Sequence, residues 1–134
     1  MTFILNERLE ADTLPILSLD HCELLMMNDR RWPWIMLVPR IPGAVELHDL
    51  ETEQRSGIFN EIMQSAKALK EASNCEKINI GALGNLVSQL HISIVARNVD
   101  DLNWPGPVWG FETRVPYDGE KADEFIASIR QRMG

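Results

Sequence analysis

Residues 89–95 read QLHISIV, a run in which polar and apolar residues alternate around the histidine at position 91. Such alternation predicts a β-strand whose successive side chains point to opposite faces of a sheet. Gln89, His91 and Ser93 then share one face, and the apolar residues between them share the face that packs on the core. Two interpretations follow: a solvated face on which the histidine is incidental, or a site built around His91.

The rest of the chain extends this strand into a sheet. Five segments carry strand patterns, joined mostly by short polar or glycine-containing breaks: 14–19, 22–27, 34–38, 77–83 and 87–97. The dipeptide Gly84-Asn85 is typical of a tight turn, so the last two segments are predicted to form a hairpin. Because the first two segments are separated only by Asp20-His21, they predict another hairpin.

Helical periodicity appears in three places. Between about residues 51 and 73, apolar residues recur at three- and four-residue steps, which predicts a long amphipathic helix. Its core-facing residues are predicted to be Ile58, Ile62, Ala66 and Leu69, with Phe59 and Met63 beside them. A short helix is predicted at 6–13 and a C-terminal helix from about Asp118. The whole chain, 1–134, is therefore predicted to be a single α+β domain with an antiparallel sheet of about five strands.

Composition narrows the classes of function. The 134 residues carry a formal net charge of −7, which argues against extended nucleic acid as a partner, since phosphate-backbone binding needs a basic face. A small phosphate-bearing ligand held by backbone N–H groups is still compatible with that charge. The two cysteines form no disulfide framework, no apolar run is long enough for a membrane span, and no signal-peptide pattern appears. A cytoplasmic protein without a metal or other cofactor is expected.

The motif around His91 resembles the signature of the histidine triad (HIT) superfamily, H-x-H-x-H-x-x with apolar residues at x. Here every apolar position fits and the central histidine is present, but Gln89 and Ser93 replace the outer histidines. The resemblance extends over roughly residues 14–110. NDRRWPWIMLVPR resembles the strand pair on the ribose side, INIGALGNLVSQLH the strand and glycine turn leading into the motif, and WPGP the C-terminal segment.

This resemblance implies a fold, an activity and a set of residue roles. Family enzymes act on nucleoside phosphates, dinucleoside polyphosphates or nucleoside phosphoramidates, and are usually homodimers. The central histidine, here His91, attacks the α-phosphorus and forms a nucleotidyl-histidine that water hydrolyses. Its other ring nitrogen is expected to donate to a backbone carbonyl. The resemblance further assigns Asn28 to the ribose, Asn79 to the scissile phosphate and the turn Gly84, Asn85 and Leu86 to the phosphate oxygens.

The replaced histidines leave the level of activity open. Gln89 can still donate an amide hydrogen bond to phosphate, but Ser93 is shorter and cannot carry positive charge. A positioned general acid or base is worth roughly 10²–10⁴ in rate, so this replacement can reduce turnover to a trace. A further histidine of the family, just past the Pro-Arg step, is also missing, and His48 is expected in a solvated position before the long helix. Besides a weakened hydrolase or transferase, a silent nucleotide-binding module and a purely structural scaffold are alternatives.

Other residue groupings predict little. His21, His48, Cys22 and Cys75 lack metal-ligand spacing. The stretch 30–34, RRWPW, contains residue types that stack on nucleobases, although core aromatics flanked by a charged turn are the favoured interpretation.

Overall fold

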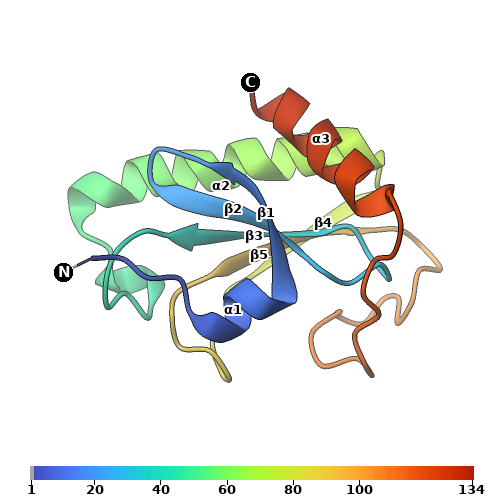
Figure 1. Cartoon of the computed structure of the whole chain (residues 1–134), viewed down its shortest axis with the longest axis horizontal. Helices are drawn as coiled ribbons and strands as arrows, with labels where there is room; N and C mark the ends of the chain where they lie inside the picture. Colours follow the sequence, from blue (N-terminus) through green and yellow to red (C-terminus); the bar gives the residue numbers. More distant parts are fainter. Residues whose placement is uncertain (1) are drawn as a thin grey trace.

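A computed structural model describes residues 2–134 and confirms the predicted α+β architecture (Figure 1). The elements in chain order are α1 (Glu7–Asp12), β1 (Thr13–Ser18), β2 (Cys22–Met27), β3 (Trp34–Pro39), the short 3-10 helix η1 (Leu47–Asp49), α2 (Thr52–Ser73), β4 (Lys77–Gly81), β5 (Ile92–Arg97) and α3 (Lys121–Met133). No helix among these is long and apolar enough to cross a membrane.

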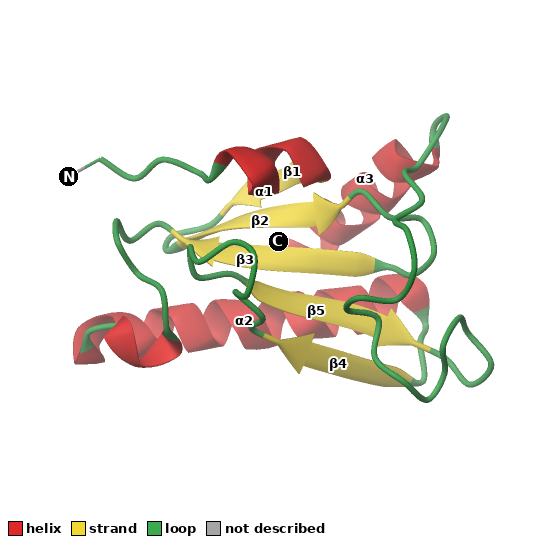
Figure 2. Cartoon of the chain, turned by 90° about the horizontal axis from the view of Figure 1, so that it is seen from below, coloured by secondary structure: helices red, strands yellow, loops and turns green. Residues whose placement is uncertain are grey.

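The five strands form one antiparallel sheet in the order β1-β2-β3-β5-β4. The predicted hairpin between the first two strands is confirmed, with a bulge at Ile16, where the pairing register shifts between Pro15 and Leu17. A proline is tolerated in β1 because this strand lies at the edge of the sheet. Figure 2 shows α1 on one face of the sheet and α2 and α3 behind the other.

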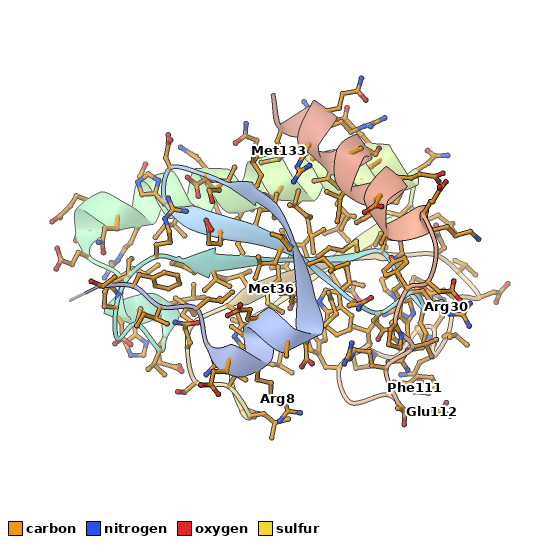
Figure 3. All side chains as sticks on the ribbon, viewed as in Figure 1. Arg8, Arg30, Met36, Phe111, Glu112 and Met133 are labelled. Carbon is orange, nitrogen blue, oxygen red and sulfur yellow. The ribbon has the colours of Figure 1, made fainter. Side chains whose placement is uncertain are left out.

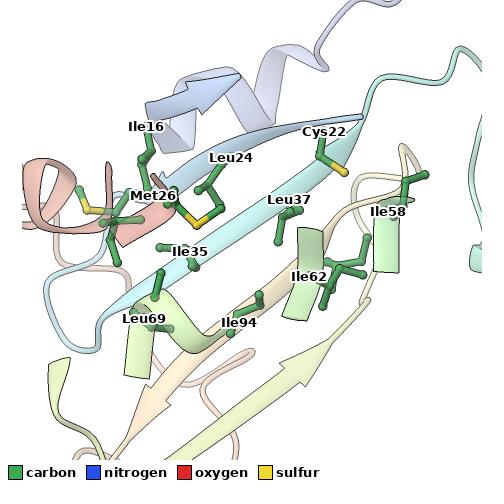
Figure 4. Close-up of a cluster of buried hydrophobic side chains, with 14 of the residues drawn as sticks. Ile16, Cys22, Leu24, Met26, Ile35, Leu37, Ile58, Ile62, Leu69 and Ile94 are labelled. Atoms are coloured by element: carbon green, nitrogen blue, oxygen red, sulfur yellow. The ribbon is translucent and has the colours of Figure 1, made fainter. Parts of the chain in front are cut away.

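The face covered by α2 and α3 contains the main core. Alternate residues of the central strands, including Leu24, Ile35, Leu37 and Ile94, are fully buried there. Figure 4 shows these side chains packed against α2. Burial of such aliphatic side chains is the main favourable contribution to folding, at about 25 cal/mol per Å² of apolar surface.

The opposite face of the sheet is covered by α1 and by loops (Figure 2), and it carries two smaller hydrophobic clusters. Leu25, Met36 and Val38 pack there with Leu9 of α1, while Trp34 and Val95 pack with Trp32 and Val108. Ser93 also points to this face and is buried, opposite Met36 and Gly81 in the sheet register. The aromatic residues of the stretch 30–34 are thus core residues, as favoured from the sequence.

The long helix α2 matches its predicted bounds, but one part of its predicted buried face is wrong. Ile58, Ile62 and Leu69 are buried, whereas Phe59 and Met63 are 59% and 43% exposed. The buried stripe instead continues on the other flank, through Glu61, Ser65 and Ala68. Hydrophobicity favours the flank of Phe59 and Met63, but the other flank is buried because Glu61 accepts the backbone N–H groups of His21 and Cys22.

The predicted tight turn at Gly84-Asn85 is also wrong. β4 ends at Gly81 and β5 begins at Ile92, so residues 82–91 form a ten-residue loop. The strand predicted over 87–97 is therefore shorter at its start, and Gln89 and His91 lie in the loop just before it. The side chains still alternate in burial here, since Leu90 is buried in the core and His91 is only partly buried.

Candidate active site

His91 is held in one orientation by its own loop. Its Nδ1 lies 2.8 Å from the backbone carbonyl oxygen of Gln89. A carbonyl oxygen can only accept, so Nδ1 carries the hydrogen and, in the neutral imidazole, Nε2 keeps its lone pair. The backbone-carbonyl partner expected for this ring nitrogen is thus present, and it leaves Nε2 as the nitrogen with a free lone pair.

An apolar hollow of about 480 Å³ begins at His91. Its lining residues come from α1, the sheet, the 82–91 loop and the C-terminal segment: Arg8, Leu9, Asp12, Met27, Met36, Leu83, Asn85, Leu86, Val87, His91, Trp109 and Gly110. Figure 3 shows Arg8 and Met36, which belong to this lining, on the α1 side of the sheet. Its volume falls within the range of about 300–1,000 Å³ typical of small-molecule sites.

Trp109 forms a wall of the hollow through contacts with β3 and β4. Its ring meets Trp34 in an edge-to-face arrangement, with centroids 6.0 Å apart. A Cβ placed on Gly81 would lie 3.0 Å from the Trp109 ring, so the absence of a side chain there allows the indole to approach β4. Neither the family motif nor hydrophobic periodicity marks Trp109 as a site residue.

The 82–91 loop supplies exposed backbone beside His91. Gly84, Asn85 and Leu86 are all exposed, and Leu86 is 81% exposed. A Cβ on Gly84 would lie 3.1 Å from the carbonyl oxygen of Val87, so the loop folds tightly at this point. Asn85 and Leu86 line the apolar hollow, and Gly84 lines a second one. The role of this turn toward a ligand stays a prediction.

Gln89 has a contact that the sequence did not reveal. Its Oε1 accepts the backbone N–H of Asn6 at 2.9 Å, and its Nε2 donates to the carbonyl of Ile4 at 2.9 Å. The amide therefore binds the N-terminal segment, although an amide nitrogen has a second hydrogen that can reach a ligand. Asn6 in turn caps α1 by accepting from the N–H groups of Arg8 and Leu9, so Gln89 links the His91 loop to the helix that covers the hollow.

The structure places the two predicted asparagines in other contacts. The Oδ1 of Asn28 accepts the backbone N–H of Tyr117 at 2.9 Å, and the Oδ1 of Asn79 accepts from Arg97 at 3.1 Å. Neither asparagine lines the apolar hollow. Arg97 is fully buried and also binds Asp101, which holds the segment after β5 against the sheet. The roles of Asn28 and Asn79 toward a ligand stay predictions.

Ser93 lies deeper than the other predicted residues. It is 2% exposed and lines neither the apolar hollow nor the loop hollow described next. Its hydroxyl is therefore poorly placed to reach a departing group without a change in the surrounding side chains. The structure brings His91 together with Gln89, Asn85 and Leu86, and places Ser93 beneath them.

A second, smaller hollow, here called the loop hollow, also touches His91. It has a volume of about 270 Å³ and is lined by Val45, Glu46, Leu47, His48, Ala82, Gly84, Leu90 and His91. His48 is exposed, as expected, but it lies in the same hollow as His91. Sequence spacing gave no sign of this, because 42 intervening residues separate the two histidines.

The remaining polar groups lie away from His91. Glu61 is buried beneath the β1–β2 turn, where it accepts from the backbone N–H groups of His21 and Cys22 and lies 3.0 Å from Nδ1 of His21. Burial, followed by the nearby Glu61, raises the pKa of the Cys22 thiol well above its usual range, so this cysteine is not an activated nucleophile. A hollow of about 520 Å³ around Arg30 and Lys121 contains none of the predicted site residues. Within residues 2–134, no cluster of three metal-ligating side chains occurs.

Comparison with known proteins establishes the family. A model of the HIT domain matches residues 8–100, so the chain belongs to the HIT domain family. A histidine triad protein from Sinorhizobium meliloti is 46% identical, with a TM-score of 0.96 over 98% of this chain and 97% of that one. A histidine triad protein from Bradyrhizobium japonicum is 41% identical, with a TM-score of 0.97 over 100% of both chains. No curated protein matches this chain.

The contact between Gln89 and the N-terminal segment gives a first prediction. Replacing Gln89 with alanine removes two hydrogen bonds to partly solvated partners, which we expect to cost about 1 kcal/mol in total. Hydrogen exchange at the Asn6 amide should then accelerate about fivefold, as measured by NMR.

Ser88→Ala is the matched control, because Ser88 is an exposed neighbour in the same loop. It should leave the Asn6 exchange rate unchanged. Equal Asn6 protection in Gln89→Ala and the native protein would contradict the role assigned to the Gln89 amide.

Proposed function

We propose that this protein binds a nucleoside phosphate in the apolar hollow and hydrolyses or transfers its nucleotidyl group through His91. The observation that carries the proposal is the Nδ1 hydrogen bond of His91 to the Gln89 carbonyl, which leaves Nε2 unprotonated on a residue that lines a hollow of ligand size. Family membership and the resemblance of the QLHISIV motif support the same activity.

The proposed reaction has two displacements. Nε2 of His91 attacks the α-phosphorus, a P–N bond forms to the imidazole, and the bond from phosphorus to the leaving group breaks with its electron pair on the leaving group. Water then attacks the same phosphorus, releases a nucleoside monophosphate and restores His91. A neutral imidazole is a competent nucleophile near pH 7 and divides one difficult displacement into two easier steps.

The hollow also fits a nucleoside by its chemistry. Leu9, Met27, Met36 and Trp109 offer an apolar lining for a base, while Arg8 and Asp12 add polar groups. The exposed loop backbone at Gly84 and Asn85 lies beside His91, where N–H groups can hold phosphate oxygens despite the negative charge of the protein.

A nucleotide-binding protein without turnover is the second candidate. It is favoured by the burial of Ser93, at 2% exposure, and by the occupied amide of Gln89. Both features weaken the two outer positions of the motif and leave the binding hollow intact.

The chemistry of His91 gives a second prediction. With adenosine or guanosine phosphoramidate, the native protein should release the mononucleotide, and rapid quenching followed by mass spectrometry should detect a nucleotidyl adduct on His91. His91→Asn should reduce both product and adduct to background, because asparagine retains a hydrogen-bonding group but is not a nucleophile.

Measurements on the native protein separate the alternatives. Absence of product and adduct in the native protein, together with a rise in melting temperature with AMP or GMP, would establish the binding module instead. A ligand at 100 times its Kd stabilises the folded state by about 2.7 kcal/mol, which shifts the melting temperature by several degrees. The absence of any shift would favour a structural scaffold.

We further propose that the protein is a homodimer joined along β4 and the adjacent flank of α2. Gly57 and Glu61 lie on the flank of α2 that meets His21. Since each residue turns a helix by about 100°, Phe59 and Met63 lie on the opposite flank. That flank and the edge strand β4 carry exposed apolar side chains, among them Ile80 at 48% exposure.

The third prediction tests this surface. Phe59→Asp should weaken self-association at least ~30-fold, because a two-fold axis places two new carboxylates in one apolar interface. Sedimentation velocity over a concentration series measures the effect. Leu102→Asp is the control, since Leu102 is also an exposed apolar residue, at 51% exposure, but lies outside this surface. A native protein that stays monomeric at all concentrations would contradict the proposal.

Cell location and domain organisation complete the proposal. Both cysteines, Cys22 and Cys75, are buried and free, as is typical of proteins from a reducing compartment. We therefore propose a cytoplasmic protein in which the chain acts as a single HIT domain, with a nucleoside phosphate as ligand.

A further inference from the structure

The loop hollow brings a second histidine to His91. One wall is formed by residues 45–48, which follow β3, and the other by Ala82, Gly84 and Leu90 together with His91. His91 therefore borders two spaces: the apolar hollow of about 480 Å³ and the loop hollow of about 270 Å³. If a nucleoside occupies the first space, the second can receive the other substituent of the phosphorus.

The wall that carries His48 is ordered by hydrogen bonds. The carboxylate of Asp49 accepts the backbone N–H groups of Val45 at 3.1 Å and Glu46 at 2.8 Å, which fixes the short turn η1. The backbone N–H of Leu90 donates to the carbonyl of Ala44 at 3.0 Å. Because Leu90 immediately precedes His91, this bond ties the two walls together next to the proposed nucleophile.

The surroundings of His48 suit a group that carries a proton. Glu46 lines the same hollow, and Asp49 is adjacent to His48 in η1. The backbone N–H groups of Glu46 and Val45, with a smaller contribution from the charge of His48, lower the pKa of the Asp49 carboxyl. Asp49 therefore stays ionised near neutral pH beside an imidazole, the side chain whose charge changes most readily in that range.

We propose that His48 is the general acid and base of the reaction, in place of the acidic group that Ser93 cannot supply. This inference rests on the proposed function of His91. When His91 attacks the phosphorus of a phosphoramidate, the P–N bond to the leaving amine breaks with its electron pair on that nitrogen, which takes a proton from the His48 imidazolium. Neutral His48 then removes a proton from the water that attacks the nucleotidyl-histidine, which returns both histidines to their starting states.

The role of His48 determines which leaving groups can depart. Without an acid, only leaving groups that depart as stable anions, such as nucleotides or phenolates, should react at a useful rate. With His48 as the acid, alkylamine leaving groups become competent, because the amine departs neutral. The volume of the loop hollow, about 270 Å³, limits the departing amine to a small one.

The fourth prediction compares two leaving groups. His48→Gln is tested on the n-butylamidate and on the p-nitrophenyl ester of both AMP and GMP. In the first turnover, before hydrolysis of the nucleotidyl-histidine limits the rate, loss of the general acid should slow release of butylamine by about 10²–10⁴-fold, whereas release of p-nitrophenolate, which needs no proton, should slow less than about tenfold. A merely structural role of His48 would slow both reactions equally and would overturn the proposal.

Controls distinguish a failure of the role proposed for His48 from a failure of the proposed function. Lys67→Gln removes one positive charge from an exposed position on α2 and should change neither rate. If the native protein cleaves the p-nitrophenyl esters through a His91 adduct but leaves the butylamidates intact, the role of His48 is refuted and that of His91 stands. If it cleaves neither substrate, the proposed function fails and the inference fails with it.

Discussion

The hydrogen bond from Nδ1 of His91 to the carbonyl of Gln89 is the contact on which the site depends. It fixes the tautomer of the imidazole, and His91 lines both hollows. The same residue, Gln89, binds Ile4 and Asn6 through its side chain. A single residue therefore orients the proposed nucleophile and fastens the segment that leads into α1. This offers a physical reason for a glutamine at the first position of the motif: its side chain links the loop of His91 to the segment that leads into α1, which covers the apolar hollow.

The two faces of the sheet differ in packing. The face beneath α2 and α3 is a continuous aliphatic core that gives the sheet its stability. The other face is divided between two small clusters, around Met36 and around Trp34, and the apolar hollow lies where these clusters leave room. A rigid core on one side thus supports side chains on the other, as binding and catalytic sites on loops require.

The sequence was sufficient for the architecture because the signals are local and strong. Each of the five strands and the helix α2 has a clear periodic pattern, and the motif around His91 identified the family. Phe59 and Met63 were placed wrongly because the flank of α2 that is buried contains Glu61, whose hydrogen bonds to the β1–β2 turn do not show in a hydrophobic pattern. The turn at Gly84-Asn85 was wrong because turn residues are equally common in longer loops.

The site was predicted less completely, because its remaining parts depend on distant segments. The contact between Gln89 and Asn6 spans 83 positions, and His48 reaches the loop hollow through the η1 turn. Trp109, which follows the last strand in the chain, also lines the apolar hollow. None of these contacts has a spacing that a linear pattern can reveal. They follow from the way the N-terminal segment, the loop after β3 and the C-terminal segment converge near the start of β5.

The most direct test of the central claim is the tautomer of His91, measured by long-range ¹H–¹⁵N NMR on protein with ¹⁵N-labelled histidine. The variants His21→Gln and His48→Gln assign the His91 signals by subtraction. The account predicts, at a pH where the imidazole is neutral, a protonated Nδ1 and an unprotonated Nε2 whose signal shifts when AMP or GMP binds. A His91 ring protonated at Nε2 would contradict it, because that nitrogen would then have no lone pair with which to attack phosphorus.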